Sequence, residues 1–286
     1  MTRIAFLFFL CLCLCSCDNV FSDFNDAEVP INGPEIPIDG PEGVYLMTKS
    51  SYYYYDSSEK SYYCSEDTYY VYDSSGKKIN ISSYSDGVQT TTTDYEYNEK
   101  EQLIKISKYD LTELFSSTYA VYVYDNQGRL VMQSSYYQDN SLQHYYTFTY
   151  EECKTIRERY NSDNCITSKS YLYYNTDNLL IRSENYNGTT FSYYTQSSYY
   201  DNGKKSETLV YDSEDIQLTR TVFEYNEQWQ LTQETTYRTE DELFFHSKTY
   251  QYDEHGNLVR YDYYDSENDA HPSYNLYEYE YTVIEQ

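Results

Sequence analysis

The sequence predicts an all-β protein, a repetitive antiparallel meander of β-hairpins that forms a long twisted or coiled sheet. From residue 44 onward Tyr, Thr, Val and Ile dominate, and these residues fit the half-buried surface of a pleated sheet. Clusters of Asp, Asn, Ser and Gly recur at short intervals and are typical of turns between strands. A pattern also returns about every 26 residues, which predicts one structural unit copied along the chain.

The composition excludes several other classes of protein. The chain has 286 residues, of which 43 are Tyr, whereas acidic disordered chains are poor in aromatic residues. Its 9 Gly and 5 Pro are too few for collagen-like or low-complexity sequences. Its 47 acidic residues outnumber 20 basic ones and give a net charge of -27, so it would repel a phosphate backbone. We therefore expect no nucleic acid among its partners.

Residues 1–16 are predicted to be a signal peptide. Arg3 supplies a short positive region, and the apolar run that follows it is too short to span a bilayer. The run ends in LCSC at residues 14–17, which resembles the lipobox of bacterial lipoproteins. The resemblance implies cleavage before Cys17 and attachment of lipid to this cysteine, so that the membrane becomes a partner. An ordinary secreted protein is the alternative.

Residues 17–43 are predicted to form a tether. After the cysteine, this stretch contains four of the five prolines, seven acidic residues and no basic residue. Such a composition cannot bury a core, and its prolines and mutual repulsion favour an extended chain. The tether would hold the repeat body, residues 44–286, away from the membrane surface.

The body repeats an anchor in which Tyr precedes Asp, Asn or Glu. Neighbouring anchors lie 24 to 27 residues apart. The residue two positions before the anchor is aromatic in seven of nine copies, which predicts one apolar strand face. Each repeat can hold two strands of about nine residues and two turns. The predicted anchors are Tyr72, Tyr97, Tyr124, Tyr150, Tyr174, Tyr200, Tyr225, Tyr252 and Tyr279.

The anchor also predicts where the hairpins turn. Asp125 suits the first position of a type I turn, and Gly128 follows where a positive φ is often needed. A type I turn followed by a left-handed glycine commonly closes a β-hairpin. We expect Gly76, Gly203 and Gly256 to play the same part in their repeats.

These residues resemble the RHS/YD repeat, Y-D-x-x-G-R-L, of bacterial RHS and toxin-complex shells and of animal teneurins. Residues 124–130 match it fully, residues 252–258 differ only at Asn257, and the other copies are degenerate. The resemblance covers about residues 72–286, with a half-repeat at 44–71. It implies a strip of antiparallel hairpins that coils into a shell or open spiral. The chain is far shorter than shell-forming members and shows no toxin after its repeats, so we do not expect it to enclose a cargo.

The same residues disfavour a transmembrane β-barrel. The lipid-facing positions of such a barrel should be Leu, Val or Phe in every strand. Neither face of the predicted strands is continuously apolar, and residues 82–102 offer no lipid face at all.

We find no constellation of catalytic residues. The four histidines lie in different repeats at no shared register, and no G-x-S-x-G, H-E-x-x-H or P-loop motif occurs. We therefore expect no enzymatic activity, no cofactor and no metal. The cysteines of the body, Cys64, Cys153 and Cys165, are expected to be free thiols, with a Cys153–Cys165 disulfide as the alternative.

Adjacent tyrosines are the candidate ligand-binding residues, namely Tyr136, Tyr137, Tyr263 and Tyr264. Neighbouring strand residues point to opposite faces, so only one ring of each pair can fill a core. The simpler interpretation is a cross-strand tyrosine ladder that stabilises the sheet. The sharper interpretation is a ligand face, where rings stack on sugars and acidic side chains bind hydroxyls. A protein ligand is equally open, because tyrosine is enriched at interfaces.

The leading hypothesis is a non-enzymatic, lipid-anchored protein of the bacterial cell envelope. Its Tyr-rich body would be a binding or structural module for a glycan or an envelope protein. We expect it at the outer membrane or cell surface rather than at the inner membrane. The alternatives are a component or remnant of an RHS-type toxin system and a carbohydrate-active envelope enzyme.

Replacing the lipidated residue tests the anchor. We expect Cys17→Ser to release the protein from the membrane fraction, because the variant has no thiol to acylate. Fractionation of cells grown with a labelled fatty acid measures both properties. A variant that still carries labelled acyl chains would refute the assignment.

Overall fold

The computed structural model describes residues 38–40, 43–56, 61–112, 117–239, 244–253, 256–265 and 273–284. The chain divides into two units, Met1–Ile36 and Pro37–Gln286, and all described residues belong to the second. Cys17 and the predicted signal peptide therefore lie outside the described residues. In the described ranges, no helix is long and apolar enough to cross a membrane.

The described chain contains nineteen β-strands. Most have seven to ten residues, close to the predicted nine. The strands are β1 (Ile38–Gly40), β2 (Gly43–Asp56), β3 (Ser61–Tyr72), β4 (Lys78–Ser85), β5 (Val88–Tyr97), β6 (Leu103–Asp110), β7 (Thr118–Tyr124), β8 (Leu130–Tyr137), β9 (Leu142–Glu151), β10 (Lys154–Asn161), β11 (Ile166–Tyr174), β12 (Leu180–Asn187), β13 (Thr190–Tyr199), β14 (Lys205–Asp212), β15 (Gln217–Tyr225), β16 (Leu231–Arg238), β17 (Phe244–Tyr252), β18 (Leu258–Asp265) and β19 (Ser273–Ile284).

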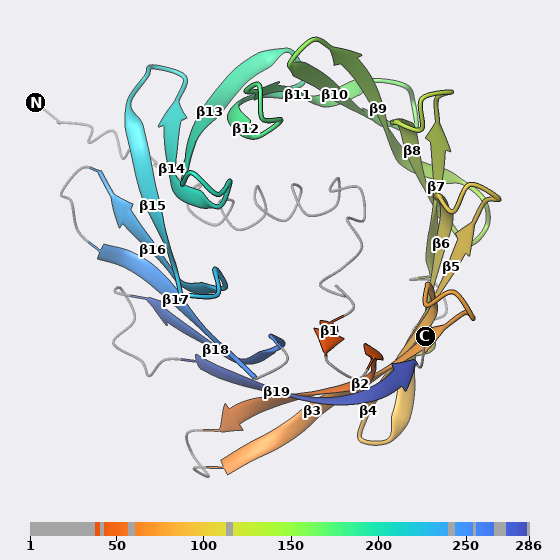
Figure 1. Ribbon diagram of the computed structural model, residues 1–286. Helices are drawn as coiled ribbons and strands as arrows, with labels where there is room; N and C mark the ends of the chain where they lie inside the picture. Colours follow the sequence, from red (N-terminus) through yellow and green to blue (C-terminus); the bar gives the residue numbers. More distant parts are fainter. Residues whose placement is uncertain are drawn as a thin grey trace, which may run out of the picture. The chain divides into compact units, whose positions relative to one another are not determined.

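Strands β2–β19 form one antiparallel sheet that closes on itself (Figure 1). Each strand pairs with the next one in sequence, which confirms the predicted meander. The sheet is not the long twisted or coiled strip that the sequence predicts, because β19 pairs with β2 from Asn275↔Tyr54 to Ile284↔Val44 and completes a barrel. Closure pairs the two edges that an open strip would leave with unsatisfied backbone groups. The short strand β1 pairs with β2 and lies within the range predicted to be tether.

A ring of eighteen strands is too wide for its own side chains to fill. Most described side chains are therefore only half-buried, and the barrel wall is a single layer with two wet faces. This explains why strands of this protein are polar on both sides. The buried hydrophobic residues are Leu103, Tyr122, Leu130, Tyr146, Phe148 and Tyr194.

Strand register divides the wall into two faces with different chemistry. We call the face that carries the anchor tyrosines the anchor face, and the opposite one the ion-pair face. Three close cross-strand ion pairs lie on the ion-pair face: Lys105–Glu96 at 3.0 Å, Lys169–Glu158 at 2.9 Å and Arg220–Glu207 at 2.5 Å. A longer pair, Lys248–Glu234 at 3.8 Å, lies on the anchor face. Stacked tyrosine pairs also lie there: Tyr119–Tyr136, Tyr145–Tyr160 and Tyr194–Tyr211, with ring centroids 4.7 to 4.9 Å apart.

The anchor tyrosines close a recurring gap in the sheet. Strand β6 begins at Leu103, but its ladder with β7 reaches only to Lys105↔Val121. The carbonyl of Leu103 therefore has no strand partner, and Tyr124 donates its hydroxyl to it at 2.7 Å. Burial raises the pKa of Tyr124, which favours the neutral donor.

The same bond recurs along the chain and defines the function of the anchor. In each case the acceptor is the first residue of a strand whose next ladder begins two residues later. The other bonds run from Tyr97 to Lys78 (2.9 Å), Tyr150 to Leu130 (2.8 Å), Tyr199 to Leu180 (2.6 Å), Tyr225 to Lys205 (2.8 Å), Tyr252 to Leu231 (2.8 Å) and Tyr279 to Leu258.

The predicted hairpin turn is confirmed. The amide of Gly128 donates to the Asp125 carbonyl at 3.0 Å, and the Asp125 carboxylate accepts the amides of Gln127 and Arg129 at 2.9 Å. Gly128 has a φ of 82°. The glycines at 76, 203 and 256 have φ values of 81° to 83°.

One predicted anchor is displaced by one residue. Tyr199, not Tyr200, donates to the carbonyl of the preceding repeat. Tyr200 instead takes the first position of the turn, where its carbonyl accepts the amide of Gly203 at 2.9 Å. The backbone of a turn needs no side-chain carboxylate for this bond, so Tyr can replace Asp there.

The three cysteines of the body are free and exposed. Cys153 lies in the turn before β10 and Cys165 in the turn after it, so a strand of eight residues, about 26 Å long, separates them. The alternative disulfide is therefore wrong for this fold.

Gly128→Val should lower the stability of the barrel by about 1 kcal/mol or more, because a β-branched residue is strained at this φ. A new Cβ would also lie 3.3 Å from Gln102 Nε2. Thermal unfolding measures the effect, with Gln127→Val as the control in the same turn. Equal melting midpoints for both variants would contradict this assignment.

Tyr124→Phe should cost about 1–2 kcal/mol, because it leaves the Leu103 carbonyl without a donor while the ring stays in place. Denaturant unfolding measures the loss. Tyr137→Phe is the matched control, since Tyr137 is 49% exposed and should tolerate the change. A loss of equal size in the control would contradict the role of the anchor hydroxyl.

Candidate functional site

The candidate site lies where the turns after Tyr199, Tyr225 and Tyr252 meet at one edge of the barrel. Trp229, the one tryptophan of the chain, occupies the turn position that Gly128 and Gly256 hold in their repeats. It has a φ of 59° and is 44% exposed. A bulky residue in the left-handed region is strained, and such strain concentrates at functional sites.

Trp229 belongs to an exposed aromatic platform. Its ring centroid lies 5.7 Å from that of Tyr200 and 6.0 Å from that of Tyr225. Tyr200 is 40% exposed, whereas Tyr225 is an anchor whose hydroxyl binds the Lys205 carbonyl. The platform is thus fixed from below by an anchor and open to solvent above.

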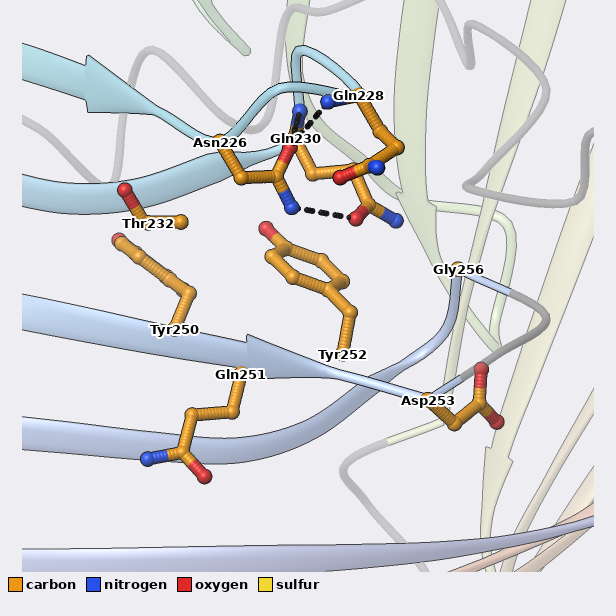
Figure 2. Close-up of a pocket in the computed structure, with 9 residues that line it drawn as sticks. All are labelled: Asn226, Gln228, Gln230, Thr232, Tyr250, Gln251, Tyr252, Asp253 and Gly256. Carbon is orange, nitrogen blue, oxygen red and sulfur yellow. Dashed lines mark hydrogen bonds between the residues drawn. The ribbon is translucent and has the colours of Figure 1, made fainter.

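A pocket of about 710 Å³ adjoins this platform (Figure 2). Figure 2 shows Tyr252 pointing from β17 toward Asn226 and Gln230, while Gln251 points away from them. Amide side chains and tyrosines predominate in the lining. The lining residues are Asn226, Gln228, Gln230, Thr232, Tyr250, Gln251, Tyr252, Asp253 and Gly256.

Hydrogen bonds hold the amides of the pocket in place. Asn226 Nδ2 donates to Gln230 Oε1 at 2.7 Å, and Asn226 Oδ1 accepts the backbone amides of Gln228 and Gln230 at 3.0 and 2.9 Å. Gly256 allows the next turn to approach, since a Cβ there would lie 3.0 Å from Gln230 Nε2. The pocket is therefore preorganised before any ligand arrives.

The charges of the pocket do not suit hydrolysis. Asp253 is the one carboxylate in the lining, and its Oδ1 accepts the amide of Asn257 at 2.8 Å as part of the turn. Glycoside hydrolysis ordinarily needs two carboxylates across the scissile bond. Tyr250 donates to Glu234 at 2.9 Å, and burial with this carboxylate raises its pKa, so it stays neutral. Neutral amides beside aromatic rings suit the hydroxyls and apolar faces of a sugar.

The four tyrosines predicted from the sequence do not form one site. Tyr136 and Tyr137 lie on β8, whereas Tyr263 and Tyr264 lie on β18, and seven strands separate them along the shorter arc of the ring. Tyr136 stacks on Tyr119 at 4.9 Å, as in the simpler ladder interpretation. Tyr137 and Tyr264 are 49% and 42% exposed, and Tyr263 lies 5.7 Å from the ring of His246.

The sequence contained a signal for Trp229 that composition alone does not reveal. Aligning the repeats on their anchors places Trp229 opposite the turn glycines, where its bulk is unexpected. Asn226, Gln228 and Gln230 belong to the same turn and would have followed from that alignment.

The histidines and acidic residues form no further site among the residues that the structure describes. His144 and His246 are half-buried on β9 and β17, and His255 and His271 lie outside the described ranges. No described group of three or more His, Cys, Asp or Glu residues is placed to hold a metal.

Comparisons with known proteins give a few distant structural likenesses. No family model matches the chain, and no curated protein matches it. A porin-like protein from Bacteroides uniformis has 13% identity and a TM-score of 0.43 over 82% of this chain and 98% of that one. A porin-like protein from Bacteroides vulgatus has 10% identity and a TM-score of 0.36 over 82% and 99%.

A structure of TcdB2-TccC3-Cdc42 has 12% identity and a TM-score of 0.18, over 78% of this chain and 15% of that one. None of the three shares enough of the fold to carry an argument about function.

Proposed function

We propose that the protein is a non-enzymatic glycan-binding module of the cell envelope, and that Trp229 and Tyr200 form its sugar-stacking platform. The observation that carries the proposal is an exposed tryptophan held at a positive φ beside a pocket of fixed amides. Aromatic rings pack on the apolar face of a sugar, and amide groups accept and donate to its hydroxyls.

The strain at Trp229 supports a functional role. Glycine at this position would relieve the backbone, as it does at Gly128 and Gly256. The tryptophan therefore costs stability that the repeats with glycine at this position avoid. Its rings contact Tyr200 and Tyr225, but both of these tyrosines are placed by their own strand or turn. A ligand that stacks on the indole would account for its presence.

We infer that the body stands outside the bilayer on a lipid attached to Cys17. A barrel that spans a membrane needs an apolar outer band about 25 Å tall. The ion-pair face carries Lys105, Lys169 and Arg220 with their acidic partners, and the anchor face carries Arg157 and Arg159. Either face would place charges in lipid, at about 2–4 kcal/mol for each basic residue near the midplane. The outer membrane or the cell surface fits this arrangement best.

A protein ligand is the second candidate, because exposed Trp and Tyr residues also anchor protein interfaces. The resemblance to RHS/YD repeats supports a third candidate function, as a component of an RHS-type toxin system. An adjacent toxin gene would favour this third candidate over glycan binding.

Trp229→Gly separates binding from stability. We expect the variant to lose binding of neutral glycans on an array while its melting midpoint stays equal or rises, because glycine removes the platform but relieves the strain. Glu101→Gly is the matched control, since Glu101 has a φ of 67° at the equivalent position of another repeat. The control should gain stability and keep full binding.

Two results would contradict the proposal. Binding of neutral glycans that survives in Trp229→Gly would show that the platform is not the sugar-stacking site. Hydrolysis of any arrayed sugar by the unmodified protein would show an enzyme instead of a binding module.

A further inference from the structure

The anchor face of β7–β13 differs in charge from the rest of the chain. In the regular ladders of these strands, within the fully described residues 118–199, the anchor face carries no Asp or Glu. The whole chain contains 47 acidic residues, so a surface of this size without any acidic residue is unusual for this protein. The same face carries two arginines, Arg157 and Arg159, at alternate positions of β10.

Both arginines lie against one buried tyrosine. The guanidinium carbon of each lies 5.8 Å from the ring centroid of Tyr146, which is 3% exposed. His144 meets the same ring edge-on at 5.5 Å. Cation–π contacts with the Tyr146 ring therefore bring both guanidinium groups together on the anchor face.

A chain of polar side chains orients Arg157. Its Nη2 donates to Ser170 Oγ at 3.3 Å, Ser170 donates to Asn185 Oδ1 at 2.9 Å, and Asn185 donates to Ser183 Oγ at 3.1 Å. The three partners are 2% to 6% exposed. This buried network fixes the orientation of the Arg157 guanidinium group.

Arg159 has hydrogen-bonding capacity that the fold does not use. In the part of the chain that the structure describes, its buried Nε donates to no acceptor. Glu158 lies between the two arginines in sequence but on the other face, where it pairs with Lys169 at 2.9 Å. Two cations about 7 Å apart on one strand face repel each other, and an anion between them would relieve the repulsion.

We propose that Arg157 and Arg159, over Tyr146, form a second binding site that takes the carboxylate of an acidic sugar. A planar guanidinium fork matches a carboxylate, and the buried serine and asparagine network fixes the position of Arg157. The ligand class rests on the proposed function, but the site uses other strands than the Trp229 platform. The net charge of the chain is negative, and salt screens its repulsion of an anion beyond about 8 Å. The affinity must therefore come from these short-range contacts.

Paired probes of equal shape test the site. The full-length protein in detergent is titrated with a trimer of galacturonic acid and with its methyl ester, which removes the charge. We expect the acid to bind at least about ten-fold more tightly than the ester. The double variant Arg157→Gln/Arg159→Gln should abolish this preference. The double variant Lys169→Gln/Arg220→Gln is the control, because it also removes two positive charges, but from the ion-pair face, and should leave the preference intact.

Further variants distinguish the absence of the second site from misfolding and from the absence of the Trp229 platform. Arg159→Lys keeps the charge but loses the fork, so it should weaken the preference in a protein that melts normally. Equal binding of acid and ester by the unmodified protein would overturn the second site, even where Trp229→Gly abolishes both. A preference for the acid that persists in Trp229→Gly but disappears in the arginine variant would establish the second site as independent of the platform.

Discussion

The hydrogen bond from an anchor tyrosine to the carbonyl of the preceding repeat is the interaction on which the barrel depends. Seven strands that follow an anchor turn begin two residues before their ladder with the next strand, which leaves one carbonyl open. The hydroxyl of the next anchor fills this gap, for example from Tyr124 to Leu103. Strand β10 is an exception, because its ladder with β11 begins at its first residue, Lys154. Phenylalanine could pack in the same place but could not donate, so the repeat requires tyrosine. The high tyrosine content is therefore in part a structural consequence of copying one unit.

The anchors connect the strands into a single-layer wall. The width of the closed ring then determines that both faces of this wall are solvated. A ring of eighteen strands leaves both faces wet, so ion pairs can occupy one face and hydroxyl-rich residues the other. The turns then become the places where side chains are free to vary. Trp229 occupies a turn position that glycine holds in several other repeats, and the aromatic platform follows from that one exchange.

The sequence predicts the local units of the fold but not their closure. The period, the hairpin turn at Asp125 and the direction of pairing all depend on residues close together in the chain. Closure depends on β2 and β19, which lie more than 200 residues apart, and on curvature summed over all strands. The Tyr200 anchor was misplaced because a second tyrosine precedes it and the hydrogen bond selects Tyr199. The sequence could not select Trp229 and Tyr200 as candidate site residues, because their contact and their exposure depend on how neighbouring turns meet.

Alkaline titration tests the role of the buried tyrosines most directly. Burial raises the pKa of the anchors Tyr124 and Tyr252, and raises that of Tyr261 to about 12. The stability that they contribute is complete below the unfolded pKa of about 10 and is lost as the pH rises toward the folded values. Tyrosinate absorbance and far-ultraviolet circular dichroism should therefore show a group of tyrosines that ionise above pH 10 together with loss of the sheet. Ionisation of all tyrosines near pH 10 with the sheet intact would contradict this account.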